Sequence, residues 1–459
     1  FRQRLVRLVD EILDAPDAPP FLLDGQAVVI DDYLAARPER AGALAARLGD
    51  GRLEAGPWYV LADELIPGGE ALVRNLLAGR RTLAALGAES PPVLYCPDSF
   101  GHPAALPVLA AGFGFGVVVL WRGYGGRRWP DGDAAWWRGP DGARTLLFHL
   151  PPDGYEFGSS LPPARDEARA RWERMREVLA PRARLGLVLV QNGADHHARQ
   201  ARVREAVRNL AAAAAPDRAR FATLRDFARQ AVERATTTPL DEVSGELRDS
   251  YGYTWTLQGT FATRAGQKRA NARVERLLLR EAEPWSALAC LRGGPSRVPL
   301  VRAAWRRLLE CHPHDTLCGC STDEVARAMD ARLEDALAQA RGIRDDALLD
   351  LQAHDPALAR EQRKAWRPVV VVRNAAPRPR GGVAELELLT FLQDVPVGPG
   401  SGGAAAKVTS WRGAPVALEG GTVPLQLLSR DVRHDRTESP RHYPDDDLVE
   451  AAKVVAWVE

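Results

Sequence analysis

The stretch of sequence best suited to chemistry is PDSFGH, residues 97–102, which follows the apolar run PPVLY. It places a carboxylate at Asp98 and an imidazole at His102, where a buried strand gives way to a helix. Such a carboxylate can attack a carbon, move a proton or bind a metal ion. Alternatively, Asp98 or Ser99 caps the helix that opens near Pro103. We expect His102 to pack beneath the turn or to bond its backbone.

Polar residues also follow other strand candidates of the chain. They are carboxylates, one arginine and two histidines, and they comprise Asp24, Asp63, Glu64, Arg122 and the segment NGADHH at 192–197. In α/β folds, ligands bind beyond the carboxyl ends of the strands. A helix cap needs one polar residue, whereas these residues gather on a whole rim. The pattern therefore favours a functional site at Asp98 over a simple cap.

A second motif, CHPHDTLCGC at 311–320, brings two histidines and three cysteines together. His312 and His314 would point in different directions on a helix, and Pro313 favours a helix end between them. The plain interpretation is an exposed link between helices. The sharper one makes one histidine a metal ligand with Asp315 beside it. A sulfur-ligated zinc knuckle is disfavoured, because a second Cys-x-x-Cys pair is missing.

Short apolar runs that alternate with helical patterns must position these residues. The seven strand candidates are FLL at 21, LEAGPWYVL at 53, PVLYC at 92, GVVVLW at 116, TLLFHL at 145, LGLVLV at 185 and RFATL at 220. Strands alternating with helices indicate a parallel sheet, either closed or doubly wound. About seven strands indicate an α/β barrel or a doubly wound sheet.

The rest of the chain changes character twice. Helical patterns with short links cover 264–291, 297–311 and 321–353, which predicts a three-helix bundle. VVVVRNAAPRPRGGVAELELL then reads as two strands around a turn. We therefore predict three domains. They are an α/β domain over 1–240, a helical middle domain over 241–360, and the beginning of a C-terminal β domain over 366–459.

Composition bounds the classes of partner. The 459 residues carry a formal charge of +1, which gives no electrostatic case for nucleic acid or an anionic membrane. No apolar run approaches the roughly 18 residues of a spanning helix. The five cysteines are an odd and sparse set, which favours a reducing compartment. We predict a soluble cytoplasmic protein that acts on small molecules, and the sequence leaves homo-oligomerisation open.

In its motifs the chain resembles the glycoside hydrolase family 38 α-mannosidases, especially their bacterial branch. The matching stretches lie in family order within residues 4–326 and are LLDGQAVVIDDYLAARPER, GRLEAGPWYVLADE, RNLLAGRR, PDSFGHPAALPVLAAGFG, QNGADHH, SGELR, TRAGQKRANARVERLL and HPHDTLCGCSTDEV. The resemblance implies an α/β barrel, a three-helix bundle and β-sandwich domains. It also implies hydrolysis of terminal α-mannosides with one Zn²⁺ per subunit.

The resemblance further assigns roles to single residues. It makes Asp98 the nucleophile and a zinc ligand, and His314 a second zinc ligand. Its substrate contacts are Arg122, Asp195, His196 and Asp315. In SGELR, Glu246 is the candidate general acid and base, with Asp249 second. The plain alternative for Glu246 is a solvated surface carboxylate.

One departure from the family pattern concerns the zinc site. The family supplies two ligands from a His-x-Asp pair, and this chain has no histidine before His102. The resemblance therefore places two further ligands upstream of Phe1. We expect Zn²⁺ to bind only where that segment is present.

The implied chemistry is hydrolysis with retention of configuration. It uses two carboxyl groups about 5–5.5 Å apart, one that attacks the anomeric carbon and one that protonates the leaving oxygen. Asp98 would form a covalent mannosyl ester, while Glu246 would need a raised pKa. Two other functions also agree with the residues. A metal-dependent carbohydrate deacetylase would release acetate, and a catalytically silent carbohydrate-binding protein would bind sugar without turnover.

Overall fold

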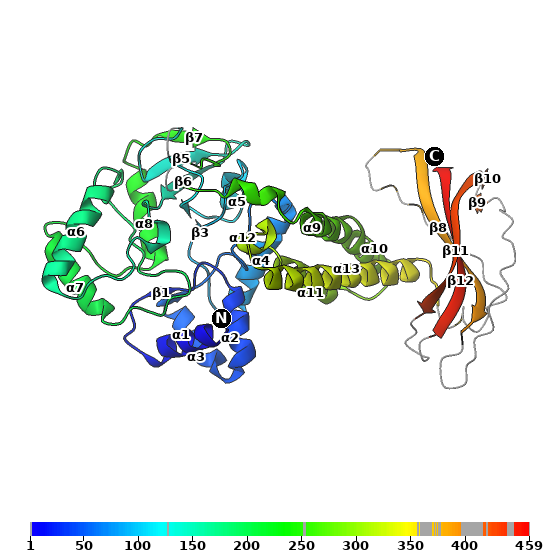
Figure 1. Ribbon diagram of the computed structural model, residues 1–459, viewed down its shortest axis with the longest axis horizontal. Helices are drawn as coiled ribbons and strands as arrows, with labels where there is room; N and C mark the ends of the chain where they lie inside the picture. The colour runs from blue at the N-terminus through cyan, green and yellow to red at the C-terminus, as the bar shows by residue number, and fades with distance from the viewer. Residues whose placement is uncertain are drawn as a thin grey trace. The chain divides into compact units, whose positions relative to one another are not determined.

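The computed structural model of the chain describes most of its residues, namely 2–125, 128–250, 254–355, 358, 370, 372, 374, 378–395, 416–418, 421–437 and 445–458. They belong to two compact units. One comprises residues 1–283 and 297–343, and the other comprises residues 284–296 and 344–459. The ribbon of Figure 1 carries the element labels used below. Within the described residues, no helix has both the length and the apolar character needed to cross a membrane.

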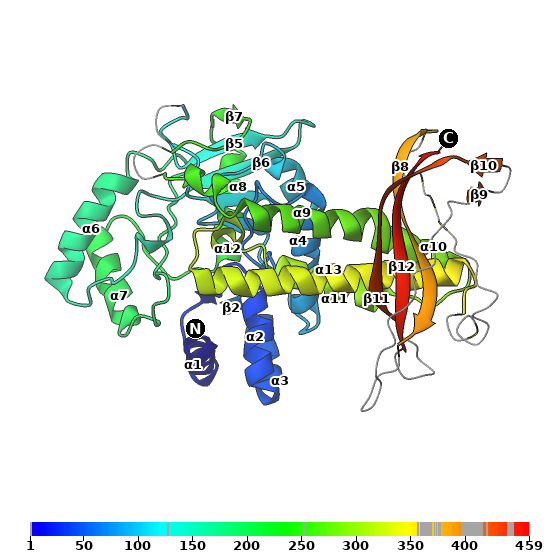
Figure 2. The ribbon, with the colours of Figure 1, turned by 45° about the vertical axis from the view of Figure 1, so that its right-hand side comes forward.

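A five-stranded mixed sheet forms the centre of the first unit. Its strands, in the spatial order β3-β4-β6-β5-β7, are β3 (Val93–Cys96), β4 (Val117–Leu120), β6 (Arg144–His149), β5 (Ala134–Arg138) and β7 (Glu242–Ser244). Neighbouring strands are parallel except β5 and β6, which pair antiparallel. Figure 2 shows β5, β6 and β7 side by side at the top of the unit. A seven-stranded parallel barrel is not confirmed.

Burial on both faces explains why the strands of this sheet read as continuous apolar runs. Leu94 and Val118 face a cluster that includes side chains of α4 (Gly69–Ala84) and α5 (Leu106–Gly112). Tyr95 and Val119 face the opposite cluster, which includes side chains of α8 (Leu224–Ala235). A sheet covered by helices on both sides and a closed barrel give the same sequence pattern, so the runs predicted the strands and not their closure.

Two expected strands at 185 and 220 are absent from the ladders of the described residues. The run at 187–190 alternates strictly. Leu187 and Leu189 pack on the sheet cluster, whereas Val188 and Val190 pack on a cluster with α6 (Arg165–Leu179) and α7 (Val203–Ala214). The alternation therefore reports burial on two sides and not strand pairing. The residues from 220 lead into α8, which begins at Leu224 with the Thr223 side chain accepting from the backbone N–H of Asp226.

The remaining expected strands near the N-terminus pair with each other. β1 (Phe21–Leu22) and β2 (Leu53–Glu54) form a separate two-stranded parallel sheet. The other helical elements before residue 263 are α1 (Arg2–Asp14), α2 (Val28–Ala36), η1 (Pro38–Arg40), α3 (Ala41–Gly49), η2 (Gly154–Glu156) and η3 (Gln258–Ala262). Buried apolar residues of α1, α2 and α3 share one cluster with this small sheet. That cluster supports the segment that leads to Asp24.

The expected helical stretches are confirmed. They are α9 (Ala265–Leu277) with the π-helical η4 (Leu278–Ala282) and α10 (Glu283–Leu291), then α11 (Val298–Leu309), and α13 (Asp323–Leu351), with the short α12 (His314–Cys318) between the last two. In α13, the buried residues recur every three or four positions and are Met329, Leu333, Ala336, Ala340 and Ile343. This spacing places them on one helix face, where they pack with residues of α9 and α11. His314 is the first residue of α12.

Long antiparallel strands dominate the C-terminal part of the second unit. β11 (Leu425–Thr437), β12 (Asp445–Val458) and β8 (Gly382–Asp394) pair in that order, and β9 (Val416–Leu418) pairs with β10 (Gly421–Val423). Most of the expected strand VVVVR at 369–373 lies outside the described residues. The domain boundaries at 240, 360 and 366 remain predictions.

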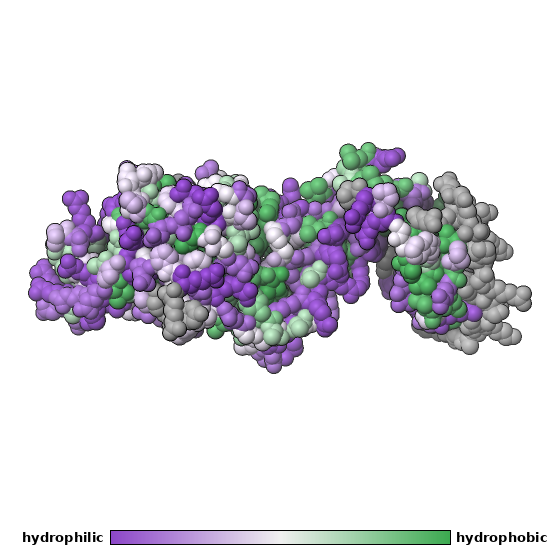
Figure 3. Space-filling view, turned by 90° about the horizontal axis from the view of Figure 1, so that it is seen from above, coloured by the Kyte–Doolittle hydropathy of each residue, from purple (hydrophilic) through white to green (hydrophobic). Residues whose placement is uncertain are grey.

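Figure 3 shows one face of the molecule coloured by hydropathy, on which hydrophilic side chains surround smaller hydrophobic areas. Large apolar side chains that are exposed in the first unit include Val298 and Leu300 of α11 and Trp255. Trp255 is relevant below, because its backbone carbonyl reaches the site.

Candidate active site

Asp98 lies in the turn that follows the buried strand β3, and 16 % of its side chain is exposed. The turn is tied to a neighbouring segment, because the Ser99 hydroxyl donates to the carbonyl of Ala62 at 3.1 Å. Helix α5 begins eight residues after Asp98, and no side chain caps it. The structure therefore rules out the helix-cap role, and the carboxylate is free for other partners.

Arg122 is the first of these partners. It lies two residues after β4, and its Nε donates to Oδ1 of Asp98. A second nitrogen of the same guanidinium donates to the carbonyl of Trp255 at 2.8 Å, and the group lies 4.4 Å from the ring centre of Trp121. Because the guanidinium is held at three places, it fixes the orientation of the Asp98 carboxylate.

His314 is the second partner, and it is the first residue of α12. Its Nε2 lies 3.4 Å from Oδ2 of Asp98, while its Nδ1 donates to the carbonyl of Leu61 at 3.1 Å. The edge of the ring meets Phe100 at a centroid distance of 5.3 Å. His312, two residues earlier, points instead into the bundle, where its Nε2 meets Asn271 at 2.8 Å. The two histidines diverge as the sequence predicts.

The charges around Asp98 and His314 favour the ionised forms of both groups. Burial by itself raises the pKa of Asp98, but the bonds from His314 and the positive charge of Arg122 outweigh it and lower that pKa. Burial lowers the pKa of His314, whereas Asp98 and the charge of Asp315 raise it to about 9. A carboxylate that stays ionised is what a nucleophile requires.

Asp315 stands at the open side of this pair. Its Oδ2 lies 3.9 Å from His314 Nε2, and 57 % of its side chain is exposed. The thiol of Cys320 donates to its Oδ1 at 3.2 Å. Cys311, in contrast, is buried among the bundle residues and approaches the carbonyls of Arg307 and Met329. The three cysteines of the motif therefore do not converge on one metal ion.

Two further carboxylates lie on the same rim as Asp98. The Tyr155 hydroxyl, on η2, donates to Oδ2 of Asp195 at 3.0 Å, and its ring meets Trp121 edge-on at 5.7 Å. Burial raises the pKa of Tyr155, and the negative charges of Asp98 and Asp195 raise it further. Tyr155 therefore joins Asp195 to the Asp98 cluster. Spacing along the chain does not point to Tyr155, because it comes six residues after β6.

Asp24 follows β1 and is the second of these carboxylates. Gln26 donates to its Oδ2 at 3.0 Å. Although part of the residue meets solvent, burial of its carboxyl raises its pKa to about 7, with His314 opposing and the charges of Asp195 and Asp98 adding to the rise. Its neighbour Gly25 has φ +65°, and a Cβ there would lie 2.5 Å from the Tyr95 ring. The close approach explains the glycine after Asp24.

The two predicted acids of SGELR occupy different surroundings. The Glu246 side chain is 54 % exposed and lies 3.7 Å from Arg248. Asp249 is buried, its backbone N–H donates to the carbonyl of Gly123 at 3.0 Å, and burial raises its pKa. His196 and His197 are exposed on the loop that carries Asp195. The structure therefore gathers Asp98, Arg122, His314 and Asp315 most closely.

Asp98 and His314 are suited to supply two of the ligands of a zinc ion. A catalytic zinc takes about three protein ligands from imidazole and carboxylate groups. Oδ2 of Asp98 and Nε2 of His314 face each other, and the Leu61 carbonyl fixes the other imidazole nitrogen, as outer partners of zinc ligands do. The donor chemistry suits zinc, and the family resemblance expects two more ligands.

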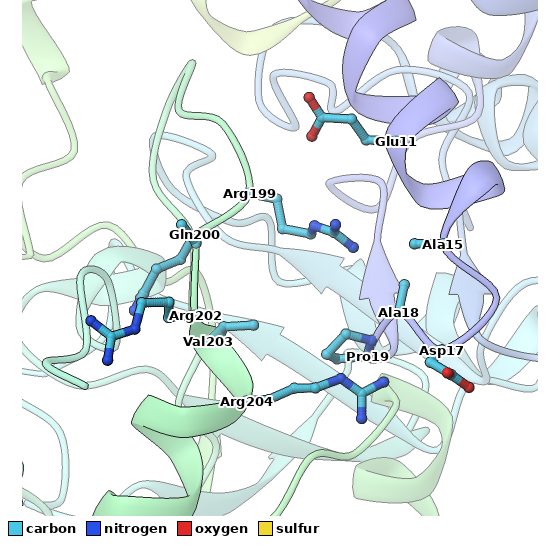
Figure 4. A pocket seen from close by; sticks show the side chains of 11 residues that line it. Glu11, Ala15, Asp17, Ala18, Pro19, Arg199, Gln200, Arg202, Val203 and Arg204 are labelled. Carbon is cyan, nitrogen blue, oxygen red and sulfur yellow. The ribbon is translucent and has the colours of Figure 1, made fainter. Parts of the chain in front are cut away.

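A recess of about 450 Å³ lies elsewhere, between the end of α1 and the start of α7 (Figure 4). Its charged lining residues are Glu11, Asp17, Arg199, Arg202 and Arg204. It mixes both signs of charge, and none of the predicted site residues lines it.

Two models of known protein families match the chain. The model of the glycosyl hydrolases family 38 N-terminal domain matches residues 3–267, which is more than half of the chain. The chain belongs to glycosyl hydrolase family 38. The alpha mannosidase middle domain matches residues 255–351, where α9, α11 and α13 lie. The resemblance that the motifs indicated is thereby confirmed.

Relatives of the family 38 chain include a putative mannosylglycerate hydrolase of Halalkalibacterium halodurans, 32 % identical over 72 % of the chain and 38 % of that protein. Human alpha-mannosidase 2C1 is 25 % identical over 73 % of the chain and 31 % of its own length. The matched part of the chain thus spans only about a third of each of these proteins. The crystal structure of an alpha-mannosidase from Enterococcus faecalis V583 matches with a TM-score of 0.84 and 26 % identity, covering all of this chain and 52 % of that one.

Proposed function

We propose that the complete protein is a retaining, zinc-dependent α-mannosidase that removes terminal α-mannosyl residues. The observation that carries this proposal is the Asp98 carboxylate, held by Arg122 and His314 at the end of a buried strand. The names of the relatives share the mannosyl group, which supports α-mannosides as the substrate class. The free cysteines among the described residues agree with a cytoplasmic setting.

In this proposal Asp98 attacks the anomeric carbon and forms a mannosyl ester, which water then hydrolyses. Arg122 orients the carboxylate through Oδ1, so that Oδ2 is the oxygen that faces His314. A second carboxyl group protonates the leaving oxygen and later accepts a proton from the water. Asp315, open to solvent beside His314, accepts hydrogen bonds from sugar hydroxyls.

Asp98 and His314 would hold the zinc ion together with ligands from outside this chain segment. When bound, the ion supplies positive charge that stabilises oxygen atoms of the sugar in the transition state. The Leu61 carbonyl holds the proton of His314 on Nδ1, so Nε2 is the nitrogen that would bind the ion after releasing its own proton.

Removal of the metal is expected to abolish activity. In the complete protein, hydrolysis of an aryl α-mannoside should fall by at least about 10²-fold after chelation and return when Zn²⁺ is added. Rates before and after dialysis against a chelator, with metal content measured on the same samples, check this. Full activity in a metal-free sample would refute the zinc requirement.

The stereochemistry of the product tests the retaining mechanism. The attack of Asp98 inverts the anomeric carbon, and the attack of water on the ester inverts it again. The first product should therefore be α-mannose, with the configuration of the substrate. Proton NMR of the anomeric signals, recorded before the sugar mutarotates, distinguishes α-mannose from β-mannose. β-Mannose as the first product would contradict the nucleophilic role of a carboxylate. Acetate release without mannose would instead support the deacetylase alternative.

A further inference from the structure

A fully buried pair, His102 and Glu64, lies beneath the turn that carries Asp98. Their side chains are 0 % and 1 % exposed, and His102 Nδ1 lies 2.8 Å from Glu64 Oε2. The other ring nitrogen, Nε2, lies 3.1 Å from the backbone carbonyl of Arg122. The ring therefore stands between Glu64 and the residue that holds the nucleophile.

Hydrogen-bond chemistry fixes the roles of the two ring nitrogens. A carbonyl only accepts, so Nε2–H donates to the oxygen of Arg122. A proton must then lie between Nδ1 of His102 and Oε2 of Glu64, because two lone pairs 2.8 Å apart would repel each other. A shared proton therefore joins the two side chains in one defined orientation. We call this hydrogen-bonded pair, His102 and Glu64, the strut.

Cys96 completes a buried group that resembles a metal site, since its sulfur and the ligand atoms of the pair lie within 4.8 Å of one another. The geometry disfavours a metal ion. The 2.8 Å separation is that of a hydrogen bond, whereas nitrogen and oxygen ligands on a tetrahedral zinc ion are about 3.3 Å apart.

The backbone of His102 extends the strut to a third segment. Its N–H donates to the carbonyl of Leu247 at 2.9 Å, and the N–H of Leu247 returns a bond to its carbonyl at 3.0 Å. The segment around Glu64 is also bound to the Asp98 turn through the hydroxyl of Ser99. Through its ring and its backbone, His102 thus connects the turn of Asp98, the backbone of Arg122 and the segment after Glu246.

We propose that His102, braced by Glu64, is a positioning residue that sets the Arg122 guanidinium and the Asp98 carboxylate in register for attack. The inference rests on the proposed mannosidase function. It assigns no direct contact with the sugar to His102. Misplacing catalytic groups by about 1 Å costs about 10²-fold in rate, so the strut affects catalysis even though it is buried.

The test compares four variants of the complete protein with the wild type. Glu64→Leu should lower kcat on an aryl α-mannoside by about 10²-fold with little change in KM. Glu64→Gln should retain more of the rate, because its amide N–H can donate to Nδ1. Glu64→Leu/His102→Leu removes both partners, which restores stability but not kcat, since buried polar partners replaced together cost little. Cys96→Ala should leave kcat and metal content unchanged.

Each other outcome overturns the proposal. Recovery of kcat together with thermal stability in the double variant would show a purely structural role. Loss of bound metal in Cys96→Ala and Glu64→Gln would show a metal site. Crystal structures of the wild type and of Glu64→Leu test the positioning role of His102 without relying on activity. A shift of the Arg122 guanidinium supports the inference even if no mannose is released, and an unmoved Arg122 refutes it.

Discussion

Asp98→Ala should lower the hydrolysis of α-mannosides by about 10⁴-fold or more while leaving the fold intact. The carboxylate is the nucleophile of the proposed mechanism, and Arg122 and His314 hold both of its oxygens in place. In the wild type, a 2-fluoro mannosyl substrate with a good leaving group slows hydrolysis of the ester, so mass spectrometry of a digest should find the sugar on the peptide that contains Asp98. Steady-state rates of the unlabelled wild type and of Asp98→Ala give the loss.

Two controls separate chemistry from metal binding in this experiment. Asp98 is also a predicted zinc ligand, so metal content must be measured beside the rates. Azide should restore turnover of an activated substrate in Asp98→Ala and yield β-mannosyl azide, because it enters the space that the carboxylate leaves. The matched variant Asp217→Ala removes an exposed carboxylate beyond α7 and should behave like the wild type. A label on another peptide would refute the assignment.

The second large effect concerns the general acid. We expect Asp195→Asn to slow substrates with poor leaving groups by about 10²–10⁴-fold and activated aryl substrates much less. Tyr155 orients Asp195 from the side of Trp121, and the carboxyl is open to a leaving group. Asp24 has the raised pKa of an acid, but His314 is its strongest charged neighbour, which places it on the side of the nucleophile.

Measuring kcat/KM over a series of aryl and alkyl mannosides decides between the carboxyls. A steep dependence on the leaving-group pKa in Asp195→Asn, and a normal one in Glu246→Gln, supports Asp195. The reverse pattern would establish Glu246, the candidate from the sequence, and Asp249→Asn is tested next if neither variant responds. Asp24→Asn completes the set, because its slope shows whether the raised pKa serves proton transfer.

The residues that gather around Asp98 were easier to predict from the sequence than the fold that carries them. Asp98 and Arg122 each lie two residues after a strand and His314 begins a helix, and such positions are visible as polar residues near the ends of apolar runs. The five-stranded sheet was not visible, because apolar runs report burial and carry no information on which strands pair. The reversed direction of β5 follows from its short link to β6, which spacing alone does not reveal.

Contacts between distant segments were also beyond the sequence. Tyr155 and Asp195 are 40 positions apart, and the bond between them depends on how the loop after residue 190 folds back over η2. Glu64 and His102 were both noticed as polar residues, but only the folded chain shows that they share a proton. Periodicity identifies faces of single elements, whereas such pairs require the packing of several elements.

The alternating run at residues 187–190, which we call the seam, packs between two apolar clusters. It limits how the loop that carries Asp195 can change in evolution. Its side chains alternate between two apolar clusters, so the deletion of one residue would exchange every side chain between them. Changes in length are therefore tolerated only beyond the seam, within residues 192–202. Divergence in substrate preference through this loop should thus appear as substitutions and insertions at its tip, while its starting point stays anchored.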